Sequence, residues 1–409
     1  MDLQKFGPYS TEESSVASYE LPDPLRKRDG TRVCSACEWM NRQRGDILDL
    51  FKHEEYGEIL PRPDRMSFQL LSFRDDALGN TAIRKEIRLD FGMRNGKSCS
   101  AVMLLYLPKR AVGPVPAFLG LNFKGNHNTT DEADVLPTGF LAPGKLAEEA
   151  RALQIERWCF REVIARGYAS ATLCYHDIHP DRIDADGDSV FRLFFDEARY
   201  GAISETHSVI GAWAWGLSRA LDCLESEPAV DASRVAVHGH SRLGKTALWA
   251  GATDRRFAMV IGNDSGCGGA ALHKRKFGEN LSQHFGSHLQ NGVPVWFVER
   301  CRRYIRHEER MPFDQHELLA LIAPRPLCIG TATQDIYADP YGEFLACRHA
   351  APVYRLFGSE GFAGTEMLRP DTWIEGDISF HYRTGKHDQT PWDWARYLDA
   401  ADRRWKSGN

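Results

Sequence analysis

Long apolar runs alternate with amphipathic stretches over most of the chain beyond residue 115. The apolar runs cover 116–123, 168–173, 234–238, 257–262 and 326–332. The amphipathic stretches cover 145–166, 206–227, 243–252 and, near the end of the chain, 392–405. Unbroken apolar runs are typical of strands covered on both faces, and their alternation with helical patterns indicates right-handed crossovers. We therefore predict an α/β protein, a three-layer αβα sandwich with a mostly parallel central sheet.

A different pattern precedes residue 115. Three segments rich in strand-forming residues cover 67–73, 82–91 and 98–107. Apolar and polar residues alternate in the second segment, which predicts half-exposed antiparallel strands as an N-terminal extension of the sheet. The first 65 residues are loop-rich apart from a helical pattern at 37–56. We expect residues 1–65 to form an arm that packs on a single α/β domain of residues 66–409.

Composition and charge exclude several classes of protein. The 409 residues are 43% hydrophobic and carry a net charge of −5, which gives no signal for a nucleic-acid partner. No run of about 18 apolar residues occurs, so no membrane span is expected. The N-terminus lacks the apolar segment of a signal peptide, so either the protein is cytoplasmic, the default expectation, or its leader is missing from this sequence. We also expect a monomer.

The cysteine pattern does not indicate a metal site or a disulfide framework. The ten cysteines occur mostly singly, several of them in apolar runs, which favours buried free thiols over a disulfide framework. Cys34 and Cys37 form a lone C-x-x-C pair, and without a second pair a zinc site is not expected. The basic stretch 273–276 is interpreted as a solvated loop. We expect neither a metal nor an organic cofactor.

The segment 235–249 carries the first sign of chemistry. An apolar run ends in Gly239, Ser241 follows two residues later, and a helical pattern begins directly after it. A serine at a sharp strand-to-helix turn holds its hydroxyl clear of the backbone and can serve as a nucleophile. The usual pattern is G-x-S-x-G, whereas this chain has Leu243 and a glycine only at 244. The alternative is a serine that caps the following helix.

A nucleophilic serine needs a histidine base and an acid that orients the histidine. In α/β-hydrolase folds the acid and then the histidine follow the serine along the chain. His387 lies in a loop just before the final helix, and we favour it over His381, which lies in the strand pattern. Two acids remain open, because Asp264 and Asp335 each follow an apolar run.

Arg242 and Lys245 bring positive charge beside Ser241. A cation directly after the serine can stabilise an oxyanion or a negatively charged acyl group, and Lys245 lies one helical turn further on. The alternative for each is a surface ion pair. Ligands of open α/β sheets bind outside the carboxyl ends of the strands, so we expect long connections to wall the site. These connections are 124–144, 175–202 and 265–313.

The segment 239–245 resembles the G-C-S-R-x-G-K motif of the glucuronoyl esterases, carbohydrate esterase family 15. Further segments resemble the family in the same order over nearly the whole chain. They are 21–24, 122–127, 265–270, 312–316, 322–326 and 381–387. Members of this family cleave esters between 4-O-methyl-D-glucuronic acid on xylan and alcohols of lignin.

The resemblance implies a role for each candidate residue. Ser241 is implied as nucleophile and His387 as base. Arg242 is implied as an oxyanion-stabilising side chain, and Lys245 and Glu279 as contacts of the sugar.

The resemblance also has departures. Asp264 falls where many members carry a glutamate as the acid, and Asp335 falls where others place an alternative acid. Tyr337 stands where many members have a tryptophan that packs on the sugar, and it keeps an aromatic face. The family is mostly secreted, although no leader is seen in this chain.

We therefore expect a serine esterase that hydrolyses esters of 4-O-methyl-D-glucuronic acid through a Ser-His-Asp triad and an acyl-enzyme. The expected partner is a glucuronate-ester carbohydrate, such as glucuronoxylan or its fragments. An acetyl-xylan or general carboxylesterase on the same fold is the alternative, but an apolar acyl pocket would need no polar cluster of this kind. A carbohydrate-binding protein on an inactivated hydrolase scaffold is disfavoured by the complete set of serine, acid and histidine.

Overall fold

A computed structural model describes residues 7–139, 151–182, 184–285 and 296–406. The described residues form one ten-stranded sheet in the order β1-β2-β3-β5-β4-β6-β7-β8-β10-β9. The strands are β1 (Arg65–Asp76), β2 (Ala82–Gly92), β3 (Ser98–Pro108), β4 (Val115–Asn122), β5 (Ala169–Cys174), β6 (Val230–His240), β7 (Met259–Asn263), β8 (Leu327–Ala332), β9 (Thr372–Ile374) and β10 (Ile378–Arg383).

The centre of the sheet is parallel. Strands β5, β4, β6, β7, β8 and β10 pair with their neighbours in parallel register. Every residue of β5, β7 and β8 is buried, as expected for strands covered on both faces. The predicted mostly parallel sheet is confirmed, with strand bounds that differ from the apolar runs by a few residues.

The two flanks of the sheet are antiparallel. Strands β1, β2 and β3 pair antiparallel, and β3 joins the central sheet through antiparallel pairing with β5. Strand β2 alternates between buried and partly buried residues along most of its length, which confirms the predicted extension. Strand β1 is largely exposed and shifts register between Leu70 and Ser72, while the short β9 closes the opposite edge.

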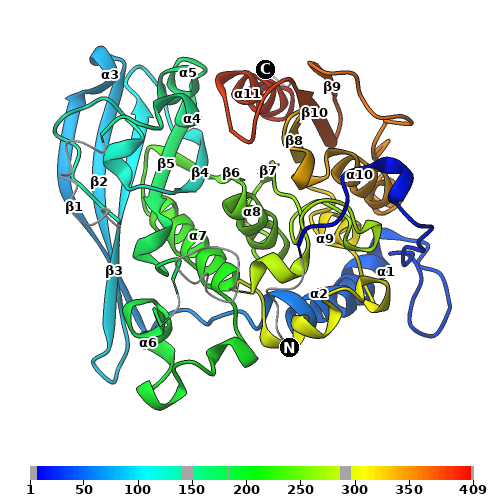
Figure 1. Ribbon diagram of the computed structural model, residues 1–409. Coiled ribbons are helices and arrows are strands. Elements are labelled where there is room, and N and C mark those ends of the chain that lie inside the picture. Colours follow the sequence, from blue (N-terminus) through cyan, green and yellow to red (C-terminus); the bar gives the residue numbers. More distant parts are fainter. Residues whose placement is uncertain (1–6, 140–150, 183, 286–295, 407–409) are drawn as a thin grey trace.

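Helices cover both faces of the sheet (Figure 1). The longer helices are α2 (Arg44–Phe51), α5 (Phe160–Ala165), α7 (Val209–Glu225), α8 (Arg242–Thr253), α9 (Gln315–Ala320), α10 (Pro340–Arg355) and α11 (Pro391–Trp405). The shorter ones are α1 (Ala36–Glu38), α3 (Ala77–Asn80), α4 (Ile155–Trp158) and α6 (Phe191–Phe194). Helices α7 to α10 pack on one face and α5 and α11 on the other, which gives the three predicted layers.

The helical patterns of the sequence mostly correspond to helices. Those at 206–227, 243–252 and 392–405 are confirmed as α7, α8 and α11. The pattern at 145–166 contains α4 and α5, and its first part, 145–150, lies outside the described residues. Helix α10 was not predicted, because Pro352 in its interior interrupts the helical pattern.

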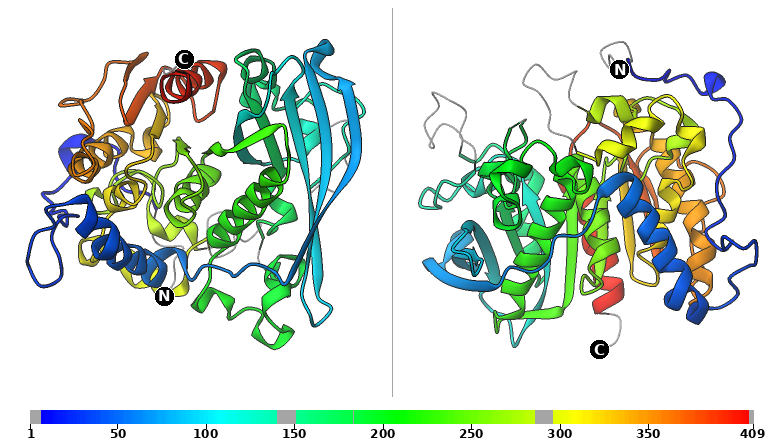
Figure 2. Two further views of the ribbon diagram at one scale, coloured as in Figure 1. Left: turned by 180° about the vertical axis from the view of Figure 1, so that it is seen from behind. Right: turned by 90° about the horizontal axis from the view of Figure 1, so that it is seen from below.

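The N-terminal segment lies along the helical layer below the sheet (Figure 2). The predicted helix at 37–56 is found as α1 and α2 with π-helical turns between and after them. Arg44 of α2 donates from Nε to the carbonyl oxygen of Leu321 at 3.1 Å. The chain then crosses to β1, and the Pro61 carbonyl accepts a hydrogen bond from Trp215 of α7 at 2.7 Å. The division into an arm and a domain at residue 65 stays a prediction.

The basic stretch 273–276 is not the solvated loop that the sequence predicted. The side chains of His273 and Arg275 are buried. His273 Nε2 lies 2.9 Å from a carboxylate oxygen of Glu55, and Arg275 Nε lies 2.9 Å from Asp339 Oδ2. These partners come from distant segments of the chain, so the local composition wrongly predicted that the basic side chains face solvent.

None of the ten cysteines forms a disulfide with another cysteine of the structure, and seven of them are buried. None of the helices in the described part of the chain is long and apolar enough to cross a membrane.

Candidate active site

Ser241 lies at the turn between β6 and α8, at the carboxyl end of a central strand. Its φ of 58° and ψ of −130° form a strained conformation for a residue with a side chain. Its N–H donates to the carbonyl oxygen of Asn263 at 2.9 Å, which ties the turn to β7. The hydroxyl does not cap α8 and makes no hydrogen bond to another described residue. The capping alternative is therefore wrong, and the hydroxyl is free to react.

Two glycines make this turn possible. A Cβ on Gly239 would lie 2.0 Å from the carbonyl oxygen of Leu243, and a Cβ on Gly244 would lie 3.0 Å from that of Asn263. The Leu243 side chain is 1% exposed and packs in the core. The close helix-to-strand approach therefore falls at residue 244, which explains the departure from the usual G-x-S-x-G pattern.

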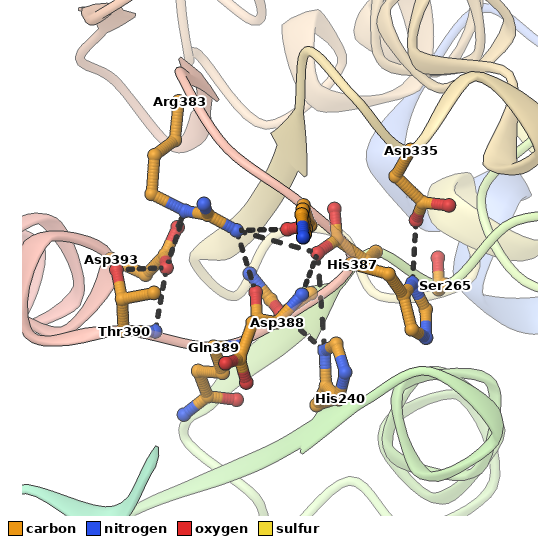
Figure 3. A network of polar contacts seen from close by, with 12 residues as sticks. His240, Ser265, Asp335, Arg383, His387, Asp388, Gln389, Thr390 and Asp393 are labelled. Atoms are coloured by element: carbon orange, nitrogen blue, oxygen red, sulfur yellow. Dashed lines mark hydrogen bonds and ion pairs between the residues drawn. The ribbon is translucent and has the colours of Figure 1, made fainter. Parts of the chain in front are cut away.

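His387 lies in the loop between β10 and α11, over the end of β6. Its Nδ1 donates to Asp335 Oδ2 at 2.6 Å (Figure 3). Its ring lies 4.5 Å, centroid to centroid, from the ring of His240, the residue before Ser241. No hydrogen bond joins Ser241 Oγ to His387 among the described residues, and such contacts are often long until substrate binds. An imidazole held through Nδ1 has Nε2 available to accept a proton.

The second candidate acid, Asp264, is held differently. It is 1% exposed, and its Oδ2 accepts the N–H of Asp388 at 3.3 Å and lies 3.7 Å from Arg383 Nη2. Its Oδ1 has no hydrogen-bond partner among the described residues. Burial, together with the nearby carboxylates of Asp335 and Glu343, raises the pKa of Asp264 well above its usual range.

Both aspartates nevertheless lie close to His387. One ligand atom from each of Asp264, Asp335 and His387 lies within 4.8 Å of the other two, and in the described part of the chain this is the group that could hold a metal ion. A histidine and two carboxyl groups therefore meet beyond the ends of β7, β8 and β10, and His240, whose ring packs on His387, directly precedes Ser241. Such a set can abstract a proton from a hydroxyl and transfer an acyl group.

A buried arginine fixes the loop that carries His387. Arg383 Nη2 donates to the carbonyl oxygens of Lys386 at 3.0 Å and Asp388 at 2.7 Å, one on each side of His387. Its Nε donates to Asp393 Oδ2 at 2.9 Å (Figure 3). The histidine is thus positioned by a hydrogen-bonded network and not by its own contacts alone.

Arg242, the first residue of α8, forms an ion pair with Asp181. Its guanidinium carbon lies 4.7 Å from the centroid of the Trp296 ring and 5.9 Å from that of Phe123. Its Nε–H is buried and has no partner among the described residues. Arg242 is thus half of an ion pair, the predicted alternative, but it also keeps an unused donor beside Ser241.

Lys245 and Glu279 form a second polar pair. Lys245 is buried, and its Nζ donates to the carbonyl oxygen of Ser265 at 2.6 Å and lies 3.3 Å from Glu279 Oε2. Burial raises the pKa of Glu279, but the Lys245 ammonium outweighs that effect, and the pKa lies below its usual range. This pair can donate to and accept from hydroxyl groups of a ligand.

Tyr337 lies on the exposed rim near this pair. Its side chain is 57% exposed, and its carbonyl oxygen accepts the N–H of Glu279 at 2.9 Å. The residue is two positions after Asp335, so an aromatic face lies between the His387 end and the Glu279 end of the site.

Sequence reasoning missed several residues around the site. Asp181 and Trp296 flank Arg242, His240 packs on His387, and Arg383 holds its loop. The long connections predicted to wall the site do supply Asp181 and Trp296, although parts of these connections lie outside the described residues. A single sequence carries no signal for pairs so far apart along the chain, apart from that loop placement.

Comparisons with known proteins show which family this chain resembles. Residues 165–358 match the family model described as glucuronyl esterase, fungi. The chain is 38% identical to carbohydrate esterase MZ0003 from an unknown prokaryotic organism, covering 98% of this chain and 93% of that protein. It is 29% identical to a 4-O-methyl-glucuronoyl methylesterase of Schizophyllum commune, covering 87% of this chain and 78% of that protein.

A solved structure gives the same result. The glucuronoyl esterase from Solibacter usitatus superimposes with a TM-score of 0.89 at 37% identity, covering 96% of this chain and 100% of that chain. Identity at this level over nearly the full length of both chains goes beyond a shared fold. The chain belongs to the glucuronoyl esterase family, carbohydrate esterase family 15, and is a carboxylic ester hydrolase.

Proposed function

We propose that this protein hydrolyses esters of 4-O-methyl-D-glucuronic acid through a triad of Ser241, His387 and Asp335. The observation that carries the proposal is the 2.6 Å hydrogen bond from His387 Nδ1 to Asp335. It lies beside the end of β6, where Ser241 stands in a strained turn with an unengaged hydroxyl. The names of the Schizophyllum commune and Solibacter usitatus relatives support the uronic acid as the acyl group.

The reaction follows in two steps. His387 Nε2 takes the proton of Ser241 as Oγ attacks the ester carbonyl carbon, and the carbonyl oxygen becomes an oxyanion. Arg242 Nε–H, which has no partner among the described residues, is proposed as the donor to that oxyanion. The intermediate collapses, His387 gives its proton to the departing alcohol, and the acyl group stays on Ser241. Water then attacks with His387 again as base, which releases the uronic acid and restores the serine.

The second polar pair supports a sugar as the acyl group. Lys245 lies one turn of α8 after Ser241 and pairs with Glu279, and together they offer donors and acceptors that match sugar hydroxyls. The exposed ring of Tyr337 offers an apolar face for the pyranose. Asp264 is proposed as a buried neighbour of the triad and not as its acid, because its raised pKa disfavours the ionised form.

The test compares turnover of benzyl D-glucuronate with turnover of an acetylated sugar. We expect the wild-type protein to prefer the glucuronate ester and Ser241→Ala to lose hydrolysis of it. Ser233→Ala, at an exposed position, is the control and should keep wild-type turnover. Undiminished turnover in Ser241→Ala would refute the nucleophile, and faster cleavage of acetyl esters would favour a general carboxylesterase.

A further inference from the structure

The surroundings of Arg242 are more elaborate than an oxyanion donor alone requires. Asp181, from the connection after β5, binds Arg242 Nη1 with its Oδ2. The other carboxylate oxygen, Oδ1, accepts the indole N–H of Trp296 at 2.9 Å. The Tyr175 hydroxyl lies 3.3 Å from Oδ2 and also donates to it. Asp181 therefore has three protein partners, and its side chain is 6% exposed.

Trp296 contacts both members of the ion pair. Its N–H binds Asp181, while its ring covers the Arg242 guanidinium with 4.7 Å between the guanidinium carbon and the ring centroid. The ring also stacks on His284, with 5.1 Å between the ring centroids and 24° between the two planes. The indole is thus held by His284 and Asp181, and its ring contacts the Arg242 guanidinium.

This arrangement leaves one edge of the guanidinium unused. Nη1 is engaged by Asp181, whereas Nε is buried and has no partner in the described part of the chain. An arginine side chain has several rotatable bonds, and fixing it in one conformation costs conformational entropy. Here that cost is met during folding, because the ion pair and the two ring contacts hold the side chain before any substrate binds.

The ion pair also sets the charge of the site. The product of the proposed reaction is a carboxylic acid that ionises at neutral pH, and two bare cations beside it would hold it firmly. Arg242 is balanced by Asp181 and Lys245 is balanced by Glu279. A balanced pair still donates a directional hydrogen bond to an oxyanion, but it attracts the free product less strongly.

We propose that Asp181 is a positioning residue that, together with Trp296, locks Arg242 with its Nε–H directed to the oxyanion and offsets its charge so that the acid product leaves. This inference rests on the proposed function, in which Arg242 is the oxyanion donor. It adds a residue that touches neither substrate nor reacting atoms and acts only through the arginine.

The first test is the variant Asp181→Asn, assayed on benzyl D-glucuronate with free glucuronate as inhibitor. Loss of a whole oxyanion donor lowers kcat by about 10²–10³-fold, so a misplaced donor should lower kcat by about 10–100-fold with KM nearly unchanged. The inhibition constant for glucuronate should fall by roughly tenfold, because a cation is no longer offset. General damage to the loop would weaken glucuronate binding instead, so an unchanged or increased inhibition constant overturns the proposal.

Asp188→Asn is the matched control. Asp188 belongs to the same connection and pairs with Arg182, away from Arg242. It should leave kcat and glucuronate inhibition at wild-type values. Equal effects in the two variants would mean that any lost carboxylate in this loop matters, which overturns a specific role for Asp181. Trp296→Phe keeps the ring but removes its N–H, and should lower kcat less than Asp181→Asn does.

The second test places Asp181→Asn in the background of Arg242→Ala. If Asp181 acts through Arg242, it should change kcat no further once the arginine is gone. An equal fall in both backgrounds, or wild-type kcat in Asp181→Asn alone, overturns the inference and leaves the proposed function intact. Wild-type kcat in Arg242→Ala would instead refute the oxyanion role in the proposed function, and the positioning role with it.

Discussion

The connections after β7 and β8 each bring an aspartate to His387, but they hold their carboxyl groups in opposite ways. Asp335 makes one short hydrogen bond, to the histidine, at the open rim of the site. Asp264 is fully buried and is held by a backbone N–H and the guanidinium of Arg383. Position along the chain does not distinguish these two acids, whereas the partners of each carboxyl group do.

The difference is electrostatic in origin. A carboxyl group must be ionised to stabilise the imidazolium that forms when the histidine takes a proton. Burial and neighbouring carboxylates raise the pKa of Asp264, so its proton is retained to a higher pH than in water. In the proposed function, Asp264 therefore supports the loop that carries His387, and Asp335 is the acid of the triad.

The largest expected effect comes from Asp335→Asn. The amide keeps the shape of the side chain but favours the wrong tautomer of His387, so kcat on benzyl D-glucuronate should fall by about 10⁴-fold. The thermal midpoint should change little, because this hydrogen bond lies at the surface. A fall of less than about tenfold would move the role of the acid to Asp264 and reverse the comparison.

A smaller but still severe effect is expected from Arg383→Met. Removing the guanidinium takes away the arginine partner of the buried Asp393, which keeps its contact with His381, and frees the loop on both sides of His387. The free energy of unfolding, measured in urea, should fall by about 3–5 kcal/mol.

The control for that experiment is Arg403→Met. Arg403 pairs with Glu375 at 2.7 Å between two exposed side chains, and its loss should cost at most about 1 kcal/mol. An equal fall in the free energy of unfolding in Arg383→Met and Arg403→Met would show that Asp264 and its neighbours do not form a buried support for the His387 loop.

Asp264→Asn should have the smallest effect on turnover, within about tenfold of wild type, because the triad acid remains. The stability of the wild-type protein relative to this variant should depend on pH. In the unfolded chain the wild-type carboxyl loses its proton near pH 4, while in the folded protein it does so only at higher pH. The stability that the group confers is therefore complete below about pH 4 and is lost as the pH rises through the folded pKa.

The measurement is the difference in thermal midpoint between Asp264→Asn and wild type, which should grow in favour of the variant from about pH 4 to pH 8. A difference that shrinks over this range would show that the folded protein stabilises the ionised form of Asp264. That result would make Asp264 an equal candidate for the acid.

Much of this architecture was predictable from local pattern. Continuous apolar runs identified the parallel strands, because burial on both faces removes the need for polar residues. The strand-to-helix turn made Ser241 the candidate nucleophile, and chain order then made His387 and both aspartates its candidate partners. Helix α10 was missed because the proline in its interior outweighed its apolar face in a local pattern.

Contacts between distant segments were not predictable in the same way. Asp181 reaches Arg242 and Glu55 reaches His273 only through the fold, so their charges appear unrelated along the chain. For the same reason the basic stretch 273–276 was placed in solvent although its partners bury it. Composition reports the charges of a segment, and the tertiary structure decides whether they face water.

Leu243, two residues after Ser241, has a practical consequence. Since its side chain fills the core and the glycine after it takes over the tight packing, the backbone geometry does not depend on a small residue at 243. Genome screens that demand a second glycine at a fixed spacing would pass over this protein and any others built on the same plan. A profile that also accepts a glycine three residues after the serine would recover them.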